Sequence, residues 1–519
     1  MLFTSYTFLI FFSVLVIVYW RLQGDYRKQN ALLLLGSYLF YGWWDVRFLF
    51  LLTLSTYIDY ATTLMIANGR ITASQQARSA AFLVGAGFLC GSCQWGDWDG
   101  SAAGLLVVLP DSLTDFWVTL FAVGFVVFFG AVRSLSPKIR RPRRYFLFWS
   151  VLTNLTILGL FKYFDFFAEN FVLLWQRLFG YAPSEVTVQI ALPVGISFYT
   201  FLTMSHTIDV YRKKAPATDS LLDQAAFVSF FPLLLSGPIE RGARMLPQFQ
   251  AARRAPSREE IHSSLWLIFW GLYKKLVIAD NLSRIVDLVF GPFDLGTLTE
   301  APDDGLRCLV AIYAFAIQIY CDFSGYTDMA RGVARLLGFD VMLNFNLPYF
   351  ALNPSGFWQR WHISLSSWLR DYLYIPLGGN RGGKWATYRN LAITMLLGGL
   401  WHGAAWTFVL WGVFHGVILI VYRVFGDVKG GQARLTLKNV ARGVLMFHLV
   451  CFGWLLFRAH NLDTVGAFAA AIATIGTPSR ETFELFREVL FYTWFLFAFQ
   501  CIQAWTGRLE PLDRWNWFV

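Results

Sequence analysis

The chain has 519 residues, of which 56% are hydrophobic and 15% are charged, whereas soluble domains carry roughly 25% charged residues. A soluble protein of this composition has too few polar side chains to cover its surface, so we predict an all-α polytopic membrane protein. The net charge of +10 does not indicate nucleic-acid binding, because the basic residues cluster in short loops between apolar runs, as cytoplasmic loops do.

Apolar runs recur along the whole chain and predict roughly 11–13 transmembrane helices, plus re-entrant or interfacial helices, since about 20 residues cross the hydrocarbon core. No internal repeat is visible, so residues 1–519 are predicted to form one membrane domain. The runs lie at about 5–20, 30–44, 47–66, 79–94, 115–132, 145–161, 188–210, 262–281, 306–321, 391–424, 440–457 and 486–505.

The charged loops predict how the chain is oriented. Basic residues follow the first run, and residues 133–144 carry six Lys and Arg side chains. Residues 79–132, in contrast, contain neither Lys nor Arg. The positive-inside rule then places the N-terminus outside and predicts a multi-pass membrane protein.

Residues 340–390 differ from the rest of the chain. They are too polar to span a membrane and too rich in Trp, Tyr and Phe for a solvated loop. Irregular backbone at membrane depth is tolerated where it lines a cavity, so we expect a re-entrant or partly inserted, cytoplasm-facing loop. His362 lies within it beside Arg360 and Trp361, and the residues alone leave open whether it is a buried structural histidine or a functional one.

Two carboxylates, Asp322 and Asp328, lie at the edge of an apolar run. A separation of six residues points them to different helix faces, so we do not expect a catalytic pair. Intramembrane carboxylates usually find partners inside the bundle, and the loop at 360–370 is a candidate partner. Lys274 and Lys275 either reach an interface or line a cavity.

The stretch GGLWHGAAW (398–406) contains His402, the one ionisable residue between Thr394 and Leu410. Ionisable residues inside membranes mark functional sites by default, and a neutral imidazole accepts protons at neutral pH. The alternative is a core histidine that hydrogen-bonds a carbonyl, which we favour for His415. Neither His402 nor His362 has neighbours at metal-ligand spacing, so no metal is expected.

No nucleophile motif accompanies these histidines, and direct transfer of an acyl group onto a hydroxyl fits a base without a protein nucleophile. The chain resembles the membrane-bound O-acyltransferase family, most closely the branch that acts in bacterial alginate O-acetylation. The matching stretches are LPVGISFYTF (192–201), IDVYR (208–212), SGPIER (236–241), YKKLVIAD (273–280), CDFSGYTDMA (321–330), NFNLPYFA (344–351), FWQRWHISLSSWLRDYLYIPLGGNRGG (357–383) and LLGGLWHGAAWTFVLWGVFHG (396–416).

The resemblance covers core motifs from about 190 to 420 and implies a helical bundle around a central tunnel. It implies that His402 is the catalytic histidine and that His362 is a second active-site residue. By analogy with preorganised oxyanion donors, the further tunnel or oxyanion candidates are Trp401, Asn353, Arg360, Trp361 and Asp322.

For the reaction, the resemblance implies that no cofactor is bound and that the acyl donor is acetyl-CoA or another acyl thioester from the cytoplasm. The acetyl group would pass to periplasmic acetylation proteins and onto an exopolysaccharide such as alginate. Two alternatives stay open: transfer of D-alanine or another acyl group to a cell-envelope polymer, and a non-enzymatic transporter or flippase of a lipid-linked sugar.

The sequence departs from the family pattern at two positions near these motifs. Gln359 stands before Arg360 where the family often has two basic residues, and His206 stands where an aromatic residue is common. Both departures bear on the donor or the partner more than on the class of reaction.

Overall fold

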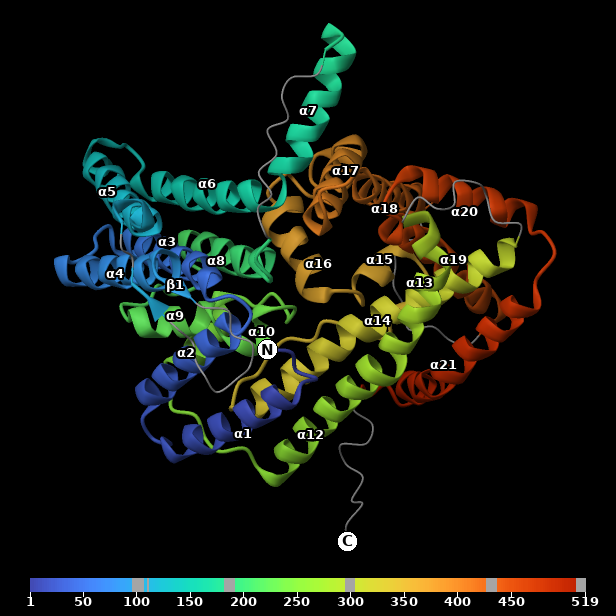
Figure 1. Cartoon of the computed structure of the whole chain (residues 1–519), viewed down its shortest axis with the longest axis horizontal. Helices are drawn as coiled ribbons and strands as arrows, with labels where there is room; N and C mark the ends of the chain where they lie inside the picture. Colours follow the sequence, from blue (N-terminus) through green and yellow to red (C-terminus); the bar gives the residue numbers. More distant parts are fainter. Residues whose placement is uncertain (96–106, 110–111, 182–191, 295–303, 426–435, 510–519) are drawn as a thin grey trace. The chain divides into compact units, whose positions relative to one another are not determined.

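The computed structural model describes residues 1–95, 107–109, 112–181, 192–294, 304–425 and 436–509 (Figure 1). The chain divides into two compact units, which are described separately. Unit 1 comprises Met1–Pro256 with Leu337–Val341, and unit 2 comprises Ser257–Leu336 with Met342–Val519. The single membrane domain expected for residues 1–519 stays a prediction.

Helices dominate the described residues, and the predicted class of all-α polytopic membrane protein is confirmed. Seven of the described helical segments are long and apolar enough to cross a membrane, whereas the total of roughly 11–13 spans stays a prediction. The seven segments are Val46–Asn68, Thr114–Lys138, Pro142–Lys162, Gly305–Leu336, Trp406–Val424, Leu437–Arg458 and Arg480–Thr506.

Unit 1 is built around helix α3, in which every residue from Leu49 to Ile66 is buried. Helices α4, α6, α8 and α9 pack against it. The elements of unit 1 are α1 (Tyr6–Arg21), α2 (Tyr26–Gly42), α3 (Leu49–Asn68), α4 (Ala73–Ala86), the antiparallel pair β1 (Gln94–Trp95) and β2 (Val107–Val108), α5 (Trp117–Leu135), α6 (Pro142–Lys162), α7 (Phe164–Phe179), α8 (Ile196–Tyr211), α9 (Leu221–Val228), α10 (Phe231–Leu234) and α11 (Gly242–Phe249).

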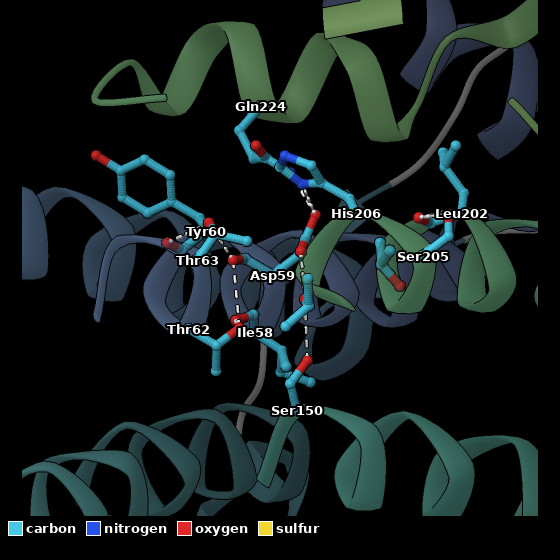
Figure 2. A network of polar contacts seen from close by, with 12 residues as sticks. Ile58, Asp59, Tyr60, Thr62, Thr63, Ser150, Leu202, Ser205, His206 and Gln224 are labelled. Carbon is cyan, nitrogen blue, oxygen red and sulfur yellow. Dashed lines mark hydrogen bonds and ion pairs between the residues drawn. The ribbon is translucent and has the colours of Figure 1, made fainter. Parts of the chain in front are cut away.

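A polar network lies buried in the centre of unit 1 (Figure 2). Asp59 of α3 accepts hydrogen bonds from His206 Nδ1 at 2.8 Å and from Gln224 Nε2 at 2.6 Å. Its second carboxylate oxygen accepts from Thr207 at 2.7 Å, and Thr207 in turn accepts from Ser150 of α6. The network satisfies a fully buried carboxylate and ties α3, α6, α8 and α9 together.

Helix α7 is the most exposed helix of unit 1, since none of its residues is buried. Phe167, Phe171 and Leu178 are each more than half exposed. A helix that combines such side chains with a polar face suits the membrane interface, so its interfacial placement stays a prediction.

Unit 2 is built around α14, which packs against α12, α13, α19, α20 and α21. Residues 340–390 form short helical segments and turns followed by the start of α17, rather than a span. The helices of unit 2 are α12 (Arg258–Leu272), η5 (Tyr273–Ala279), α13 (Asp280–Asp294), α14 (Gly305–Leu336), η6 (Pro348–Phe350), α15 (Pro354–Trp358), α16 (Ile363–Leu369), η7 (Arg370–Tyr374), α17 (Gly383–His402), α18 (Trp406–Val424), α19 (Leu437–Arg458), α20 (Leu462–Thr474) and α21 (Arg480–Thr506).

The two intramembrane carboxylates find partners other than the expected loop at 360–370. Lys274 Nζ lies 2.7 Å from Asp328, and Lys275 Nζ lies 2.6 Å from Asp322. The π-helical segment η5 packs directly against α14, so adjacent lysines reach carboxylates six residues apart on that helix. The lysines therefore brace α12 and η5 against α14, and the expected pairing with the loop is wrong.

Candidate active site

The corner between α17 and α18 in unit 2 explains the glycines of GGLWHGAAW. The two helices lie side by side (Figure 1), and a Cβ atom on Gly399 would overlap with the Phe408 carbonyl oxygen. On the facing helix, a Cβ atom on Gly412 would come within 2.5 Å of the Met395 carbonyl oxygen. A Cβ on Gly403 would overlap with the ring of Phe408. Small residues thus let the helix backbones approach closely, which places His402, the last residue of α17, against α18.

Aromatic rings surround His402 at this corner. Its ring centroid lies 5.0 Å from that of Trp401, 4.9 Å from that of Trp411 and 5.1 Å from that of Phe457. All three contacts are nearly perpendicular, and His402 remains partly exposed. The imidazole is therefore held in an apolar wall while one part of it stays accessible to a substrate.

His362 occupies a strained and buried position just before α16. Its φ of 42° lies in the left-handed region, which costs a non-glycine residue roughly 1–3 kcal/mol and is found preferentially at functional sites. The side chain is 1% exposed. Backbone hydrogen bonds hold the strain in place, since Ile363 N–H donates to the Asn344 carbonyl at 2.9 Å.

Asn344, in the loop between α14 and η6, makes a polar contact with His362. His362 Nδ1 lies 3.2 Å from the side-chain oxygen of Asn344, which also accepts from the backbone N–H of Ser364 at 3.2 Å and from its hydroxyl at 2.9 Å. The ring of Phe323 on α14 packs at 4.7 Å. Burial lowers the pKa of His362 to about 3, so its imidazole is neutral near pH 7.

Trp401 joins the two histidines. Its ring centroid lies 5.9 Å from that of His362 and 5.0 Å from that of His402. Two histidines that are 40 positions apart in the sequence therefore line one aromatic cluster within unit 2. A neutral buried imidazole and a partly exposed one at the same place are suited to moving a proton to or from a substrate.

The other predicted site residues take supporting positions. The ring of Trp361 packs 4.7 Å from that of Trp454 and 5.7 Å from that of Phe357. Asn353 accepts a hydrogen bond from Gly356 N–H at 2.7 Å and so caps α15.

The two charged candidates also have structural partners. Arg360 donates to the carbonyl of Asn346 at 3.4 Å, and Asp322 pairs with Lys275. None of these contacts joins Trp361, Asn353, Arg360 or Asp322 to His402, and their roles at the site stay predictions.

A cleft of about 380 Å³ opens beside this cluster among α15, α16, α17 and α18. Its wall includes Trp358, Arg370 and Arg423 together with hydroxyl and amide side chains. Trp358 connects the cleft to the histidines, because its ring packs 5.7 Å from that of Trp411, which contacts His402. The cleft presents two guanidinium groups, that of Arg423 and that of Arg370, which pairs with Asp371 at 2.8 Å. Guanidinium groups suit anionic ligands.

Metal ligands do not gather in the described ranges: no three His, Cys, Asp or Glu side chains there are placed to hold an ion. The absence of a metal from the mechanism stays a prediction. The six cysteines are free in the described structure, and five of them are buried.

Sequence reasoning did not identify Asn344 or Trp411 as site residues. Asn344 is one of two asparagines in the short stretch NFN, and nothing in that stretch distinguishes the buried one from its neighbour. Trp411 is one of 22 tryptophans in the chain. In both cases only the folded loop and the helix crossing show which side chain meets a histidine.

Known proteins are similar to this chain over much of its length. A model of the membrane-bound O-acyltransferase family matches residues 107–428. The chain is 36% identical to a probable alginate O-acetylase of Pseudomonas aeruginosa, over 92% of this chain and 76% of the relative. It is 36% identical to a peptidoglycan O-acetyltransferase of Helicobacter pylori, over 66% of this chain and 67% of the relative. A teichoic acid D-alanyltransferase of Bacillus subtilis is 30% identical, over 51% of this chain and 68% of the relative.

Proposed function

The chain belongs to the membrane-bound O-acyltransferase family, and on this premise we propose that it moves acetyl groups from a cytoplasmic thioester for the O-acetylation of an exopolysaccharide such as alginate. The observation that carries the proposal is the aromatic cluster that brings His362, Trp401 and His402 together beside a cleft. The similarity to alginate O-acetylases supports acetate as the acyl group and a polysaccharide as its destination.

In this proposal His402 is the general base. Its imidazole takes the proton from the acceptor hydroxyl while the hydroxyl oxygen attacks the thioester carbonyl carbon. The carbon–sulfur bond then breaks, and the thiolate leaves with the proton that His402 returns. His362 is the second catalytic histidine, and Trp401 is the best placed of the predicted oxyanion donors because its ring contacts both histidines.

The cleft is the proposed entrance for the donor. Acetyl-CoA and carrier-bound thioesters both carry phosphate groups, and Arg370 and Arg423 on the cleft wall suit such anions. We place this entrance on the cytoplasmic side of the inner membrane, with the N-terminus outside. The acetyl group would leave on the opposite side, where periplasmic acetylation proteins receive it.

The test replaces His402 by Ala and measures O-acetyl groups on the exopolysaccharide by NMR, in cells that carry this chain as their only copy. We expect a loss of roughly 10²–10⁴-fold in rate, the usual contribution of a general base. His262→Ala, at an exposed position of α12, is the matched control. A His402→Ala protein that is inserted in the membrane and acetylates at the normal rate would overturn the proposal.

A second function has a specific observation in its favour. The similarity to a teichoic acid D-alanyltransferase supports transfer of D-alanine to an envelope polymer as the alternative acyl reaction. The same cells distinguish the two, because D-alanyl esters and O-acetyl esters give different NMR signals. The names of the relatives favour acyl transfer over the transporter alternative, which predicts no ester that depends on this chain.

A further inference from the structure

The hydrogen bonds around His362 determine which of its ring nitrogens carries the proton. The side-chain oxygen of Asn344 is identified without reference to the histidine, because the backbone N–H of Ser364 donates to that atom at 3.2 Å. A backbone N–H is always a donor, so the atom that it meets is the amide oxygen and not the amide nitrogen. The hydroxyl of Ser364 donates to the same oxygen at 2.9 Å.

The same oxygen lies 3.2 Å from His362 Nδ1. An amide oxygen only accepts hydrogen bonds, so Nδ1 must carry the hydrogen of this contact. The Ser364 hydroxyl, 3.4 Å from Nδ1, has its one hydrogen in the shorter bond to Asn344 and presents its lone pairs to the ring. Both polar neighbours of Nδ1 therefore require an N–H at that position.

A neutral imidazole carries one proton, so a hydrogen on Nδ1 leaves the lone pair on Nε2. We infer that Asn344 is a positioning residue that holds His362 as the Nδ1–H tautomer, so that Nε2 is the atom that accepts a proton or a hydrogen bond during acyl transfer. This inference rests on the proposed function for the role of His362 in the reaction, but the tautomer itself does not depend on activity.

The surroundings of the ring keep this arrangement neutral. Phe323, Ser364, Trp401 and Asn344 face His362 from α14, α16, α17 and the loop before η6, and all four are uncharged. An amide at position 344 orients the imidazole in the way that a carboxylate would, but without stabilising the imidazolium. The ring is thus oriented and stays neutral, as a base must be.

Solid-state NMR of the full-length protein in lipid bilayers, labelled with ¹⁵N-histidine, tests the inference directly. The chain has seven histidines, and the signals absent from a His362→Gln sample identify those of His362. We expect a protonated Nδ1 and an unprotonated Nε2, which their couplings to the ring hydrogens distinguish. A proton on Nε2 in the wild-type protein would overturn the inference.

Two substitutions at Asn344 separate orientation from charge. Asn344→Leu removes the acceptor, and we expect a mixture of both tautomers and a loss of acetylation of about tenfold or more. Asn344→Asp keeps an acceptor for Nδ1–H but adds a negative charge, so Nε2 takes up a second proton at higher pH and the pH optimum of acetylation rises. A pure Nδ1–H tautomer in Asn344→Leu would overturn the positioning role.

Asn346→Asp is the matched control, because the hydrogen bonds between Asn346 and Arg360 use the backbone groups of Asn346. We expect its NMR signals and its acetylation to match those of the wild type.

The tautomer and the proposed catalytic role of His362 can fail separately. An active His362→Gln protein would contradict the catalytic role but would not affect the assignment of the tautomer. If His362→Gln is inactive and the wild-type protein carries the proton on Nε2, the catalytic role is supported and only the inferred tautomer is wrong.

Discussion

Unit 1 buries His206 and unit 2 buries His362 almost completely, and the two rings are held in opposite ways. His206 Nδ1 faces the Asp59 carboxylate at 2.8 Å, and its Nε2 faces the carbonyl of Pro216 at 3.1 Å. Both partners only accept hydrogen bonds, so both nitrogens of His206 must donate and the ring is an imidazolium without a lone pair. His362 instead meets an amide oxygen through one nitrogen and keeps a lone pair on the other.

The difference shows that burial does not by itself turn a histidine into a base. Partners on both nitrogens convert His206 into a cation that holds α3 and α8 together, as Figure 2 shows for its contact with Asp59. The uncharged partners Asn344 and Ser364 leave His362 reactive and let burial keep it neutral. The first arrangement serves stability and the second serves chemistry, and substitutions at each site test that division.

The largest expected effect comes from replacing each histidine by Gln. His362→Gln removes the second catalytic histidine of the proposal, so we expect acetylation to fall roughly 10²–10⁴-fold with little change in thermal stability. His206→Gln removes the cation beside Asp59, so we expect a lower unfolding temperature and a lower yield. Polymer O-acetyl content per inserted protein and the unfolding temperature of the purified protein are the two measurements, and the same response to both substitutions would contradict the comparison.

Asp59→Asn tests the ion pair between His206 and Asp59 by removing the negative charge. Breaking a buried pair by removing one charge costs about 3–5 kcal/mol, because the remaining charge stays buried without its partner. We expect a marked loss of unfolding temperature in detergent. Asp340→Asn is the control, since Asp340 pairs with Arg244 at an exposed position where such pairs contribute at most about 1 kcal/mol. Equal losses in both proteins would show that His206 is not charged.

Gly412→Ala disturbs the corner that places His402. The added Cβ would come within 2.5 Å of the Met395 carbonyl oxygen, and overpacking of this kind costs about 1–3 kcal/mol. Because the helices must separate, we expect acetylation to fall more than stability does. Gly416→Ala, one turn further along α18, is the matched control, since its Cβ would have ordinary contacts at 3.5 Å. A normal rate in Gly412→Ala would show that this close approach does not position His402.

The sequence alone predicted the class of fold and drew attention to both catalytic candidates. Composition is enough to indicate a polytopic membrane protein, because a soluble surface cannot be built from so few charges. His402 stands out because it is the one ionisable residue in a long apolar run. Both inferences depend only on the composition of the chain and on the residues next to His402, which are the same before and after folding.

The sequence alone could not predict which partners the ionisable residues have. Asp328 and Asp322 pair with Lys274 and Lys275, although the loop at 360–370 is equally basic. The choice depends on a π-helical turn that packs against α14, and such packing leaves no mark in composition or periodicity. Asn344 reaches His362 across 18 positions through a loop whose path has no repeating pattern.

Ser364→Ala is the smallest change and the finest test of how His362 is oriented. It removes the hydroxyl that donates to Asn344 at 2.9 Å, a hydrogen bond with a net contribution of about 0.5–1.5 kcal/mol. The backbone N–H of Ser364 still donates to the same oxygen, so we expect the NMR tautomer of His362 to persist and acetylation to fall no more than about threefold. A loss as large as that of Asn344→Leu would show that the hydroxyl, rather than the amide oxygen, orients the ring. Ser364→Ala and Asn344→Leu together therefore test whether the side-chain oxygen of Asn344 determines the tautomer of His362.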